Sequence, residues 1–120
     1  MRERTYVATV LQLEGAVVLL TAAYAFHALG GAWVWFAVLF LVPDLSILGY
    51  LGGPRIGAVV YNVAHTYCVP FVLLLLSLIV PETVMLRIVT IWVAHIGLDR
   101  MLGFGLKDAT GFKHTHLQRV

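Results

Sequence analysis

Residues 6–29 read YVATVLQLEGAVVLLTAAYAFHAL, and this stretch sets the class of the protein. A helix needs about 20 predominantly apolar residues to cross the hydrocarbon core of a bilayer, which is roughly 30 Å thick. The stretch reaches that length, and Glu14 is its only acidic residue, with no lysine or arginine. We therefore expect it to cross a membrane as a single helix.

The composition of the whole chain agrees with a membrane protein. Of its 120 residues, 61% are hydrophobic and only 12% are charged, and the mean hydropathy is +0.93. Soluble domains carry about 25% charged residues. The net charge is +2 and Cys68 is the single cysteine. These values exclude a disordered chain, a nucleic-acid-binding protein and a scaffold held by internal disulfides.

Three further apolar runs follow the first, at residues 32–51, 56–80 and 83–102. Glycine and proline residues mark the turns between the runs. Short connections of this kind make successive helices antiparallel neighbours. The sequence thus predicts an all-α fold, a membrane-embedded antiparallel four-helix bundle that forms one domain over residues 1–120 and ends in a tail at 103–120.

The distribution of basic residues predicts the orientation of this bundle. All of the lysines and arginines except Arg87 lie before the first run, between the second and third, or at and after the end of the fourth: Arg2, Arg4, Arg55, Arg100, Lys107, Lys113 and Arg119. With four spans these three places share one side of the membrane. Because basic residues are retained on the cytoplasmic side, both termini are expected in the cytoplasm. The tryptophans Trp33, Trp35 and Trp92 then fall in the outer half, where interfacial aromatic residues are common.

Polar side chains from all four runs lie at a similar depth in the cytoplasmic half. They are Glu14, Asp44, Asn62, His65, His95 and Asp99. Glu14, for example, lies roughly 12 Å from the cytoplasmic edge at a rise of about 1.5 Å per residue. An ionisable residue inside a membrane costs about 2.5–3.5 kcal/mol on insertion scales and marks a candidate functional site.

Spacing within the helices favours convergence of these side chains. His95 and Asp99 are four residues apart and share a helix face. Pro43, directly before Asp44, removes a backbone donor from the second run. Each residue also has a structural interpretation: a histidine packed by hydrogen bonds, an Asp99–Arg100 ion pair, or Asp44 as a helix cap.

Four blocks of the sequence resemble a known family. They are PDLSILGY (43–50), YNVAHTY (61–67), HIGLDRMLGFGLK (95–107) and GFKHTHL (111–117). These blocks are similar to those of domain-of-unknown-function family 4260, which comprises small integral membrane proteins of prokaryotes. The resemblance runs from Glu14 to His116 and implies a location in the prokaryotic inner, or cytoplasmic, membrane. It implies no activity.

The residue types at the shared depth suit a divalent metal ion. Imidazole and carboxylate ligands bind zinc, manganese or ferrous iron, and no thiolate accompanies them. A catalytic metal site uses three protein ligands and keeps one position for water or substrate. His65 and His95 with Asp99 or Asp44 are the predicted ligands.

The resulting hypothesis is a metal-dependent hydrolase of a lipid or other amphiphile, in which a metal-activated water is the nucleophile. Glu14 is its expected general base, and Asn62 and Tyr61 are expected to orient the substrate. Four further residues are expected to bind the substrate. Arg100 and Lys107 would hold a headgroup phosphate, and His114 and His116 would fold over the cytoplasmic mouth of the bundle.

Two other functions fit the same residues. A membrane-buried glutamate in the first of four spans is similar in outline to the small multidrug resistance transporters, so Glu14 would couple proton exchange to transport of a cation or metal ion. A structural subunit would instead use the polar layer as an interhelical hydrogen-bond network. The expected partners are the lipid bilayer and a second copy of the chain, since 120 residues leave little room for an enclosed substrate cavity.

Overall fold

The computed structural model describes residues 2–80 and 82–106, and the side chains from Thr5 onward within these ranges. The described residues contain helices and no strand, which confirms the all-α class. The helices are α1 (Arg2–Ala28), α2 (Trp33–Phe40), the 3-10 helix η1 (Val42–Gly52), α3 (Pro54–His65), α4 (Cys68–Ile79) and α5 (Thr83–Met101).

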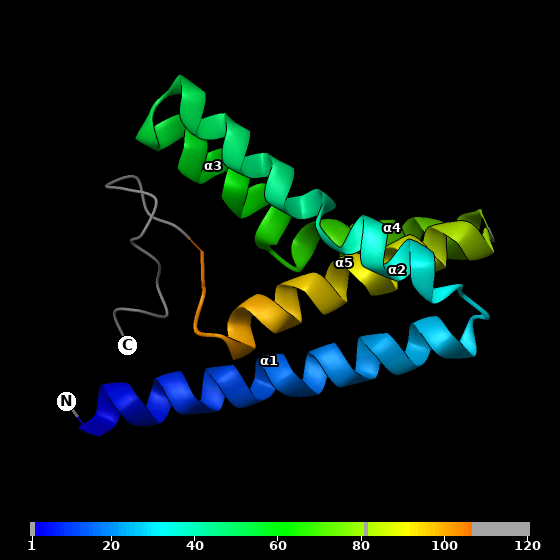
Figure 1. Ribbon diagram of the computed structural model, residues 1–120, viewed down its shortest axis with the longest axis horizontal. Coiled ribbons are helices and arrows are strands. Elements are labelled where there is room, and N and C mark those ends of the chain that lie inside the picture. Colours follow the sequence, from blue (N-terminus) through cyan, green and yellow to red (C-terminus); the bar gives the residue numbers. More distant parts are fainter. Residues whose placement is uncertain (1, 81, 107–120) are drawn as a thin grey trace.

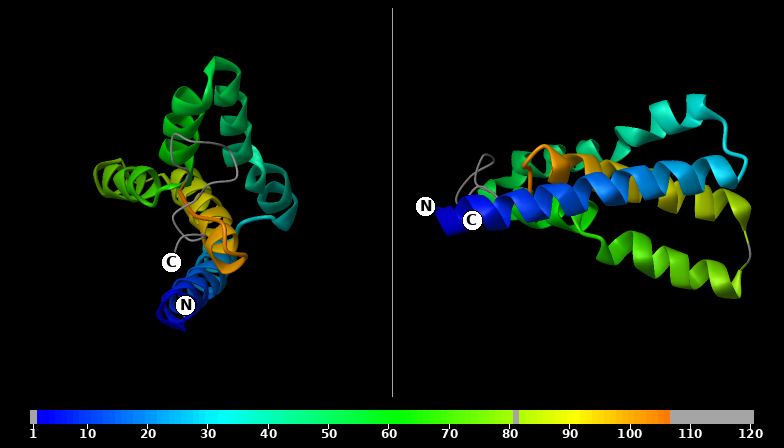
Figure 2. Two further views of the ribbon diagram at one scale, coloured as in Figure 1. Left: turned by 90° about the vertical axis from the view of Figure 1, so that its left-hand side faces the viewer. Right: turned by 90° about the horizontal axis from the view of Figure 1, so that it is seen from below.

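Helix α5 lies at the centre of the molecule, with α1, α2 and α4 packed against it. The longest contact is with α1, and Figure 1 and Figure 2 show these two helices running side by side. Glycines allow their close approach. A Cβ atom on Gly15 would lie 2.6 Å from the Cβ of Arg100, and one on Gly97 would lie 2.8 Å from the backbone nitrogen of Leu19. Small residues at such crossings let membrane helices pack tightly.

The run at 32–51 changes its winding in the middle. Helix α2 ends at Phe40 and the 3-10 helix η1 begins at Val42. Pro43 has no backbone N–H to donate to a carbonyl four residues earlier, so the α-helical ladder cannot continue through it. The next amide, that of Asp44, donates instead to the Leu41 carbonyl three residues before it, at 3.0 Å. Asp44 therefore lies in the first turn of a tighter helix.

The run at 56–80 forms two helices where one was expected. Helix α3 ends at His65 and α4 begins at Cys68, with a bend of 42° between them. Pro70 explains the break, because in a continuous helix its ring would clash with the carbonyl of Thr66 and remove a hydrogen bond there. Thr66 is extended, with ψ 149°. As a result His65 is the last residue of a helix, and the final carbonyls of α3 need partners from elsewhere.

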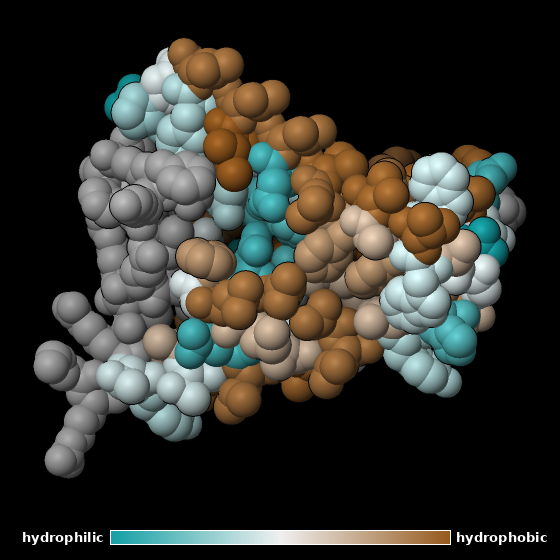
Figure 3. All heavy atoms as spheres, in the orientation of Figure 1, coloured by the Kyte–Doolittle hydropathy of each residue, from teal (hydrophilic) through white to brown (hydrophobic). Residues whose placement is uncertain are grey.

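The segments on either side of the Gly52–Pro54 turn form an antiparallel η1–α3 hairpin, residues 42–65. Figure 1 shows this hairpin projecting from the α1–α5 pair, so that only its base reaches α5. In the space-filling view of Figure 3, apolar side chains cover much of the face shown, and a narrow hydrophilic patch lies beside the hairpin. The base of the hairpin is where η1, α3 and α5 meet.

Two described helical segments, Thr5–Ala28 and Trp33–Gly52, are long and apolar enough to cross a membrane, and the bent α3–α4 pair is a third if it counts as one span. Helix α5 carries Arg87, Asp99 and Arg100 and does not reach the same apolarity. The chain therefore has the character of a membrane protein. The four-span bundle and the cytoplasmic location of both termini stay predictions.

Replacing Gly97 by leucine tests the α1–α5 contact. The added side chain meets the backbone of α1, so we expect the free energy of unfolding to fall by about 1–3 kcal/mol, as overpacking does elsewhere. The measurement is the unfolding midpoint in detergent. Ala37→Leu, on an exposed position of α2, is the matched control. Equal midpoints for the two variants would contradict the close packing of α1 on α5.

Candidate metal centre

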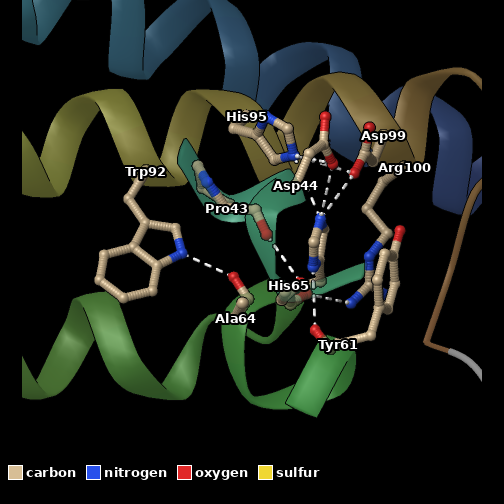
Figure 4. Close-up of polar contacts among 10 residues, drawn as sticks. Pro43, Asp44, Tyr61, Ala64, His65, Trp92, His95, Asp99 and Arg100 are labelled. Carbon is tan, nitrogen blue, oxygen red and sulfur yellow. Dashed lines mark hydrogen bonds and ion pairs between the residues drawn. The ribbon is translucent and has the colours of Figure 1, made fainter. Parts of the chain in front are cut away.

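Four potential metal ligands meet at the base of the hairpin, and they come from three elements (Figure 4). Asp44 lies in the first turn of η1 and His65 ends α3, while His95 and Asp99 are one turn apart on α5. One ligand atom from each lies within 4.8 Å of all the others. The structure thus brings together the four residues that the sequence predicted as metal ligands.

Five of the six separations among these atoms are close to those of a tetrahedral site, and the sixth, between the two carboxylate oxygens, is within 4.8 Å. The Nε2 of His95 lies 3.2 Å from Asp44 Oδ1 and 3.3 Å from Asp99 Oδ2. The Nε2 of His65 lies 3.3 Å and 3.4 Å from the same two oxygens, and the two Nε2 atoms are 3.2 Å apart. In a regular tetrahedron with metal–ligand bonds of about 2.0–2.1 Å, ligand atoms are about 3.3–3.4 Å apart. All five distances match this geometry to about 0.2 Å.

The hydrogen bond on the other side of the His65 ring determines which nitrogen faces the centre. Its Nδ1 lies 2.9 Å from the Tyr61 carbonyl oxygen. Because a carbonyl only accepts hydrogen bonds, Nδ1 carries the proton, and the Nε2 of the neutral ring presents a lone pair. That lone pair faces two carboxylate oxygens, which are also acceptors when ionised. Such a contact is repulsive unless positive charge lies between the groups. That charge is either a metal ion or an added proton.

The two imidazoles form the buried side of the centre and the two carboxylates form its open side. The side chains of His65 and His95 are 3% and 2% exposed, against 42% for Asp44 and 19% for Asp99. The Tyr61 ring stacks on His65 with centroids 3.7 Å apart and planes 7° from parallel. The Phe40 ring packs 5.0 Å from the His95 ring. An ion would be held against an aromatic wall and reached past Asp44.

Helix α5 also holds the end of α3 in place. The indole nitrogen of Trp92 donates to the Ala64 carbonyl at 2.6 Å, and Arg100 Nη2 donates to the His65 carbonyl at 3.3 Å. These are two of the carbonyls that lack partners at a helix C-terminus. A cation there is also favoured by the helix dipole. The Arg100 guanidinium lies 5.6 Å from the centroid of the Tyr67 ring. These bonds orient His65 toward His95.

The residues that the sequence assigned to catalysis lie in different places. Glu14 is exposed on α1 and lies outside the ligand group, although its carboxylate and the Arg100 guanidinium both act electrostatically on Tyr67. Asn62 is half-buried on α3, one turn before His65. Tyr61 contacts the centre directly, through its ring and its carbonyl. Lys107, His114 and His116 lie outside the described residues.

Two aromatic residues at the centre had no site role in the sequence prediction. Trp92 was assigned only to an interfacial belt, and Phe40 was part of an apolar run. The 92–95–99 spacing, which places three residues on one face of α5, was a signal for Trp92. Nothing in the local sequence indicates that Phe40 reaches His95, because that contact depends on how α2 packs on α5.

A family model, described as a domain of unknown function (DUF4260), matches residues 8–120. No curated protein and no solved structure matches the chain. The family description assigns no activity, so a function has to be argued from the geometry of the site.

Purified protein is expected to hold one divalent ion per chain, measured by inductively coupled plasma mass spectrometry. His65→Ala and His95→Ala each remove a buried ligand and are expected to lose the ion, since the remaining donors no longer complete the tetrahedron. His27→Ala, at an exposed position near the end of α1, is the control and should retain it. Wild type that stays metal-free after incubation with zinc, manganese and ferrous iron in turn would contradict a metal centre.

Metal binding should weaken as the pH falls, because protons compete with the ion for imidazole nitrogens and carboxylate oxygens. We expect added zinc to raise the melting temperature at about pH 8 and to have little effect at about pH 5, below the usual titration range of histidine. The measurement is a thermal melt with and without zinc at each pH. In His65→Ala the zinc-dependent shift should be small at both, and a shift that persists unchanged there would place the zinc elsewhere.

Proposed function

For this chain, which belongs to the family of domains of unknown function DUF4260, we propose a membrane-embedded, metal-dependent hydrolase that acts on an amphiphile of the cytoplasmic leaflet. The observation that carries the proposal is the convergence of Asp44, His65, His95 and Asp99, with five separations of 3.2–3.4 Å between their ligand atoms. Acceptor atoms are held at ligand–ligand distances on three separate elements, and that arrangement serves a cation better than it serves packing.

The donor set favours zinc, with manganese or ferrous iron as the other candidates. Two imidazole nitrogens and two carboxylate oxygens form a borderline-hard site, and the group contains no thiolate. Distances near 3.3 Å favour bonds of about 2.0 Å and four-coordination, which zinc adopts readily. A bound ion would supply Lewis-acid activation of a carbonyl or phosphoryl oxygen and of a water molecule.

A hydrolase needs a coordination position that substrate or water can occupy, and Asp44 is the ligand best placed to give one up. Its side chain is the most exposed of the four. It is also the only ligand on η1, whose 3-10 winding is a less stable form of helix. Its carboxylate, on the open side of the centre, would accept a proton from the attacking water. That water oxygen would bond to the carbonyl carbon or phosphorus, and the leaving alcohol would depart with the proton.

Arg100 supports an anionic substrate or transition state near the open side. It follows Asp99 on α5 and its guanidinium is already directed at the end of α3. Guanidinium groups bind carboxylates and phosphates with matched geometry. Glu14, the general base of the sequence hypothesis, lies on α1 outside the ligand group, so Asp44 is the nearer candidate.

A structural metal centre is the second candidate, and the number of ligands favours it. Four protein ligands are typical of closed structural zinc sites, whereas catalytic sites commonly use three. In that role the ion would fasten the η1–α3 hairpin to α5 without performing chemistry. Loss of Asp44 alone would lower turnover in a hydrolase, whereas a structural centre has no turnover to lose.

Asp44→Asn separates them. In a hydrolase we expect the ion to be retained, because both imidazoles and Asp99 remain and the asparagine carbonyl oxygen is still a donor, while turnover falls by about 100-fold or more with the loss of the proton acceptor. The assay uses protein in vesicles, a panel of carboxylic and phosphate ester amphiphiles, and mass spectrometry of the products. Glu82→Gln, at an exposed position before α5, is the matched control. Glu14→Gln compares the alternative base directly.

Metal-loaded wild type that turns over no member of the panel would contradict the hydrolase and favour the structural centre. Stripping the ion with a chelator would then lower the unfolding midpoint without changing any activity.

A further inference from the structure

A cavity of about 290 Å³ lies beside the segments of η1, α3 and α5 that carry the candidate ligands. Three of its wall residues are neighbours of the ligands: Pro43 precedes Asp44, Ala64 precedes His65, and Trp92 lies one turn before His95. Leu39, Ile88 and Ile91 complete most of the remaining wall. The cavity and the metal centre are therefore separated by little more than these backbone segments.

The polar groups of the cavity wall are already used within the protein. Ser46 Oγ donates to the Pro43 carbonyl at 2.7 Å, and the Trp92 indole nitrogen donates to the Ala64 carbonyl at 2.6 Å. A water molecule needs two to four polar partners to occupy a buried site. The wall instead presents methyl, methylene and ring carbons, so the chemistry of the cavity suits hydrocarbon.

The apolar space continues along α5 away from the centre. A second cavity, of about 510 Å³, shares Leu39, Ile88 and Ile91 with the first and extends to Val84 and to Arg87, whose guanidinium donates to the Leu29 carbonyl. Val84, Ile88 and Ile91 follow a four- and three-residue spacing on one face of α5. From Val84 to His95 the helix rises roughly 16 Å at about 1.5 Å per residue. A ligand with its polar end at the metal centre could extend a long apolar chain over this distance.

The first cavity opens toward the apolar exterior of the protein. Val42 and Ile88 are part of its wall and are 48% and 40% exposed, respectively. Val42 lies in the segment Trp33–Gly52, which is long and apolar enough to cross a membrane, and Ile88 lies on α5. An amphiphile dissolved in the bilayer can therefore enter sideways, without crossing water.

We infer that these two neighbouring cavities, here called the chain site, bind a single acyl chain of an amphiphile whose polar group lies at the metal centre. The position of the polar group rests on the proposed function, whereas the binding of the chain rests on the cavities alone. The chain runs from the ligands toward Val84, parallel to α5. The substrate class is thus a fatty acyl amphiphile, supplied as a free fatty acyl compound or as part of a membrane phospholipid.

Photocrosslinking tests this inference on the metal-loaded protein in phosphatidylcholine vesicles. One sample contains a fatty acid with a diazirine on its last carbon, and a second contains a phospholipid with the same label on one chain. Crosslinked peptides are mapped by mass spectrometry. We expect labels on Leu39, Ile88 or Ile91 to exceed those on Leu45 and Val59, which are exposed on the hairpin. Equal labelling of the two groups by both probes would overturn the chain site.

Ile88→Trp supplies the variant, because Ile88 lines both cavities and the larger ring would occupy the space of the chain. Excluding about two methylene groups should reduce labelling at Leu39 by about tenfold. Leu48→Trp makes the same change at an exposed position of η1 and should leave labelling unchanged. Ala64→Phe is a second filling variant. Undiminished labelling in both filled variants would contradict the inference.

The metal content of every sample separates this inference from the proposed function. Specific labelling in protein that binds no metal would support the chain site and remove the hydrolase. Labelling that is uniform over the surface, in protein that binds metal stoichiometrically, would leave the metal centre in place and remove the chain site. The probe that labels Leu39 more strongly identifies the source of the acyl chain.

Discussion

Two imidazole nitrogens and two carboxylate oxygens meet at the base of the η1–α3 hairpin, at separations that a bound metal ion or an added proton would stabilise. His65 contributes a lone pair because its other nitrogen donates to Tyr61, so the contact with Asp44 and Asp99 is one of acceptor with acceptor. In the low-dielectric surroundings of a membrane protein this is costly. A divalent ion would convert the same geometry into four favourable contacts and would join the hairpin to α5.

The two breaks in the helices position the candidate ligands Asp44 and His65. Pro43 changes the winding just before Asp44, and Pro70 ends α3 at His65. A straight helix over 56–80 would have kept His65 inside a continuous ladder, with its backbone carbonyl already bonded. Ending α3 there leaves carbonyls free to accept hydrogen bonds from Trp92 and Arg100, and these bonds tie the end of α3 to the helix that carries His95.

The centre combines a polar side and an apolar side. The carboxylates lie toward the exposed surface and the aromatic rings pack against the imidazoles, while the two apolar cavities lie beside the segments that carry the ligands. An apolar shell around a metal site controls water access and strengthens electrostatic contacts within it. The same division suits an amphiphile, whose polar and apolar parts need surroundings of opposite character.

The sequence by itself determined the helical class, the membrane character and the four residues that the structure groups as candidate ligands. Apolar length predicts spans, and the cost of ionisable residues at depth singles out Asp44, His65, His95 and Asp99. Only the tertiary structure decided that α3 and α4 are separate, that Phe40 and Trp92 border the centre, and that Glu14 lies outside it. Periodicity and depth place a residue along one helix, but its partners depend on how the helices rotate and cross. Those angles come from packing, such as the Gly15–Gly97 contact, which no local pattern encodes.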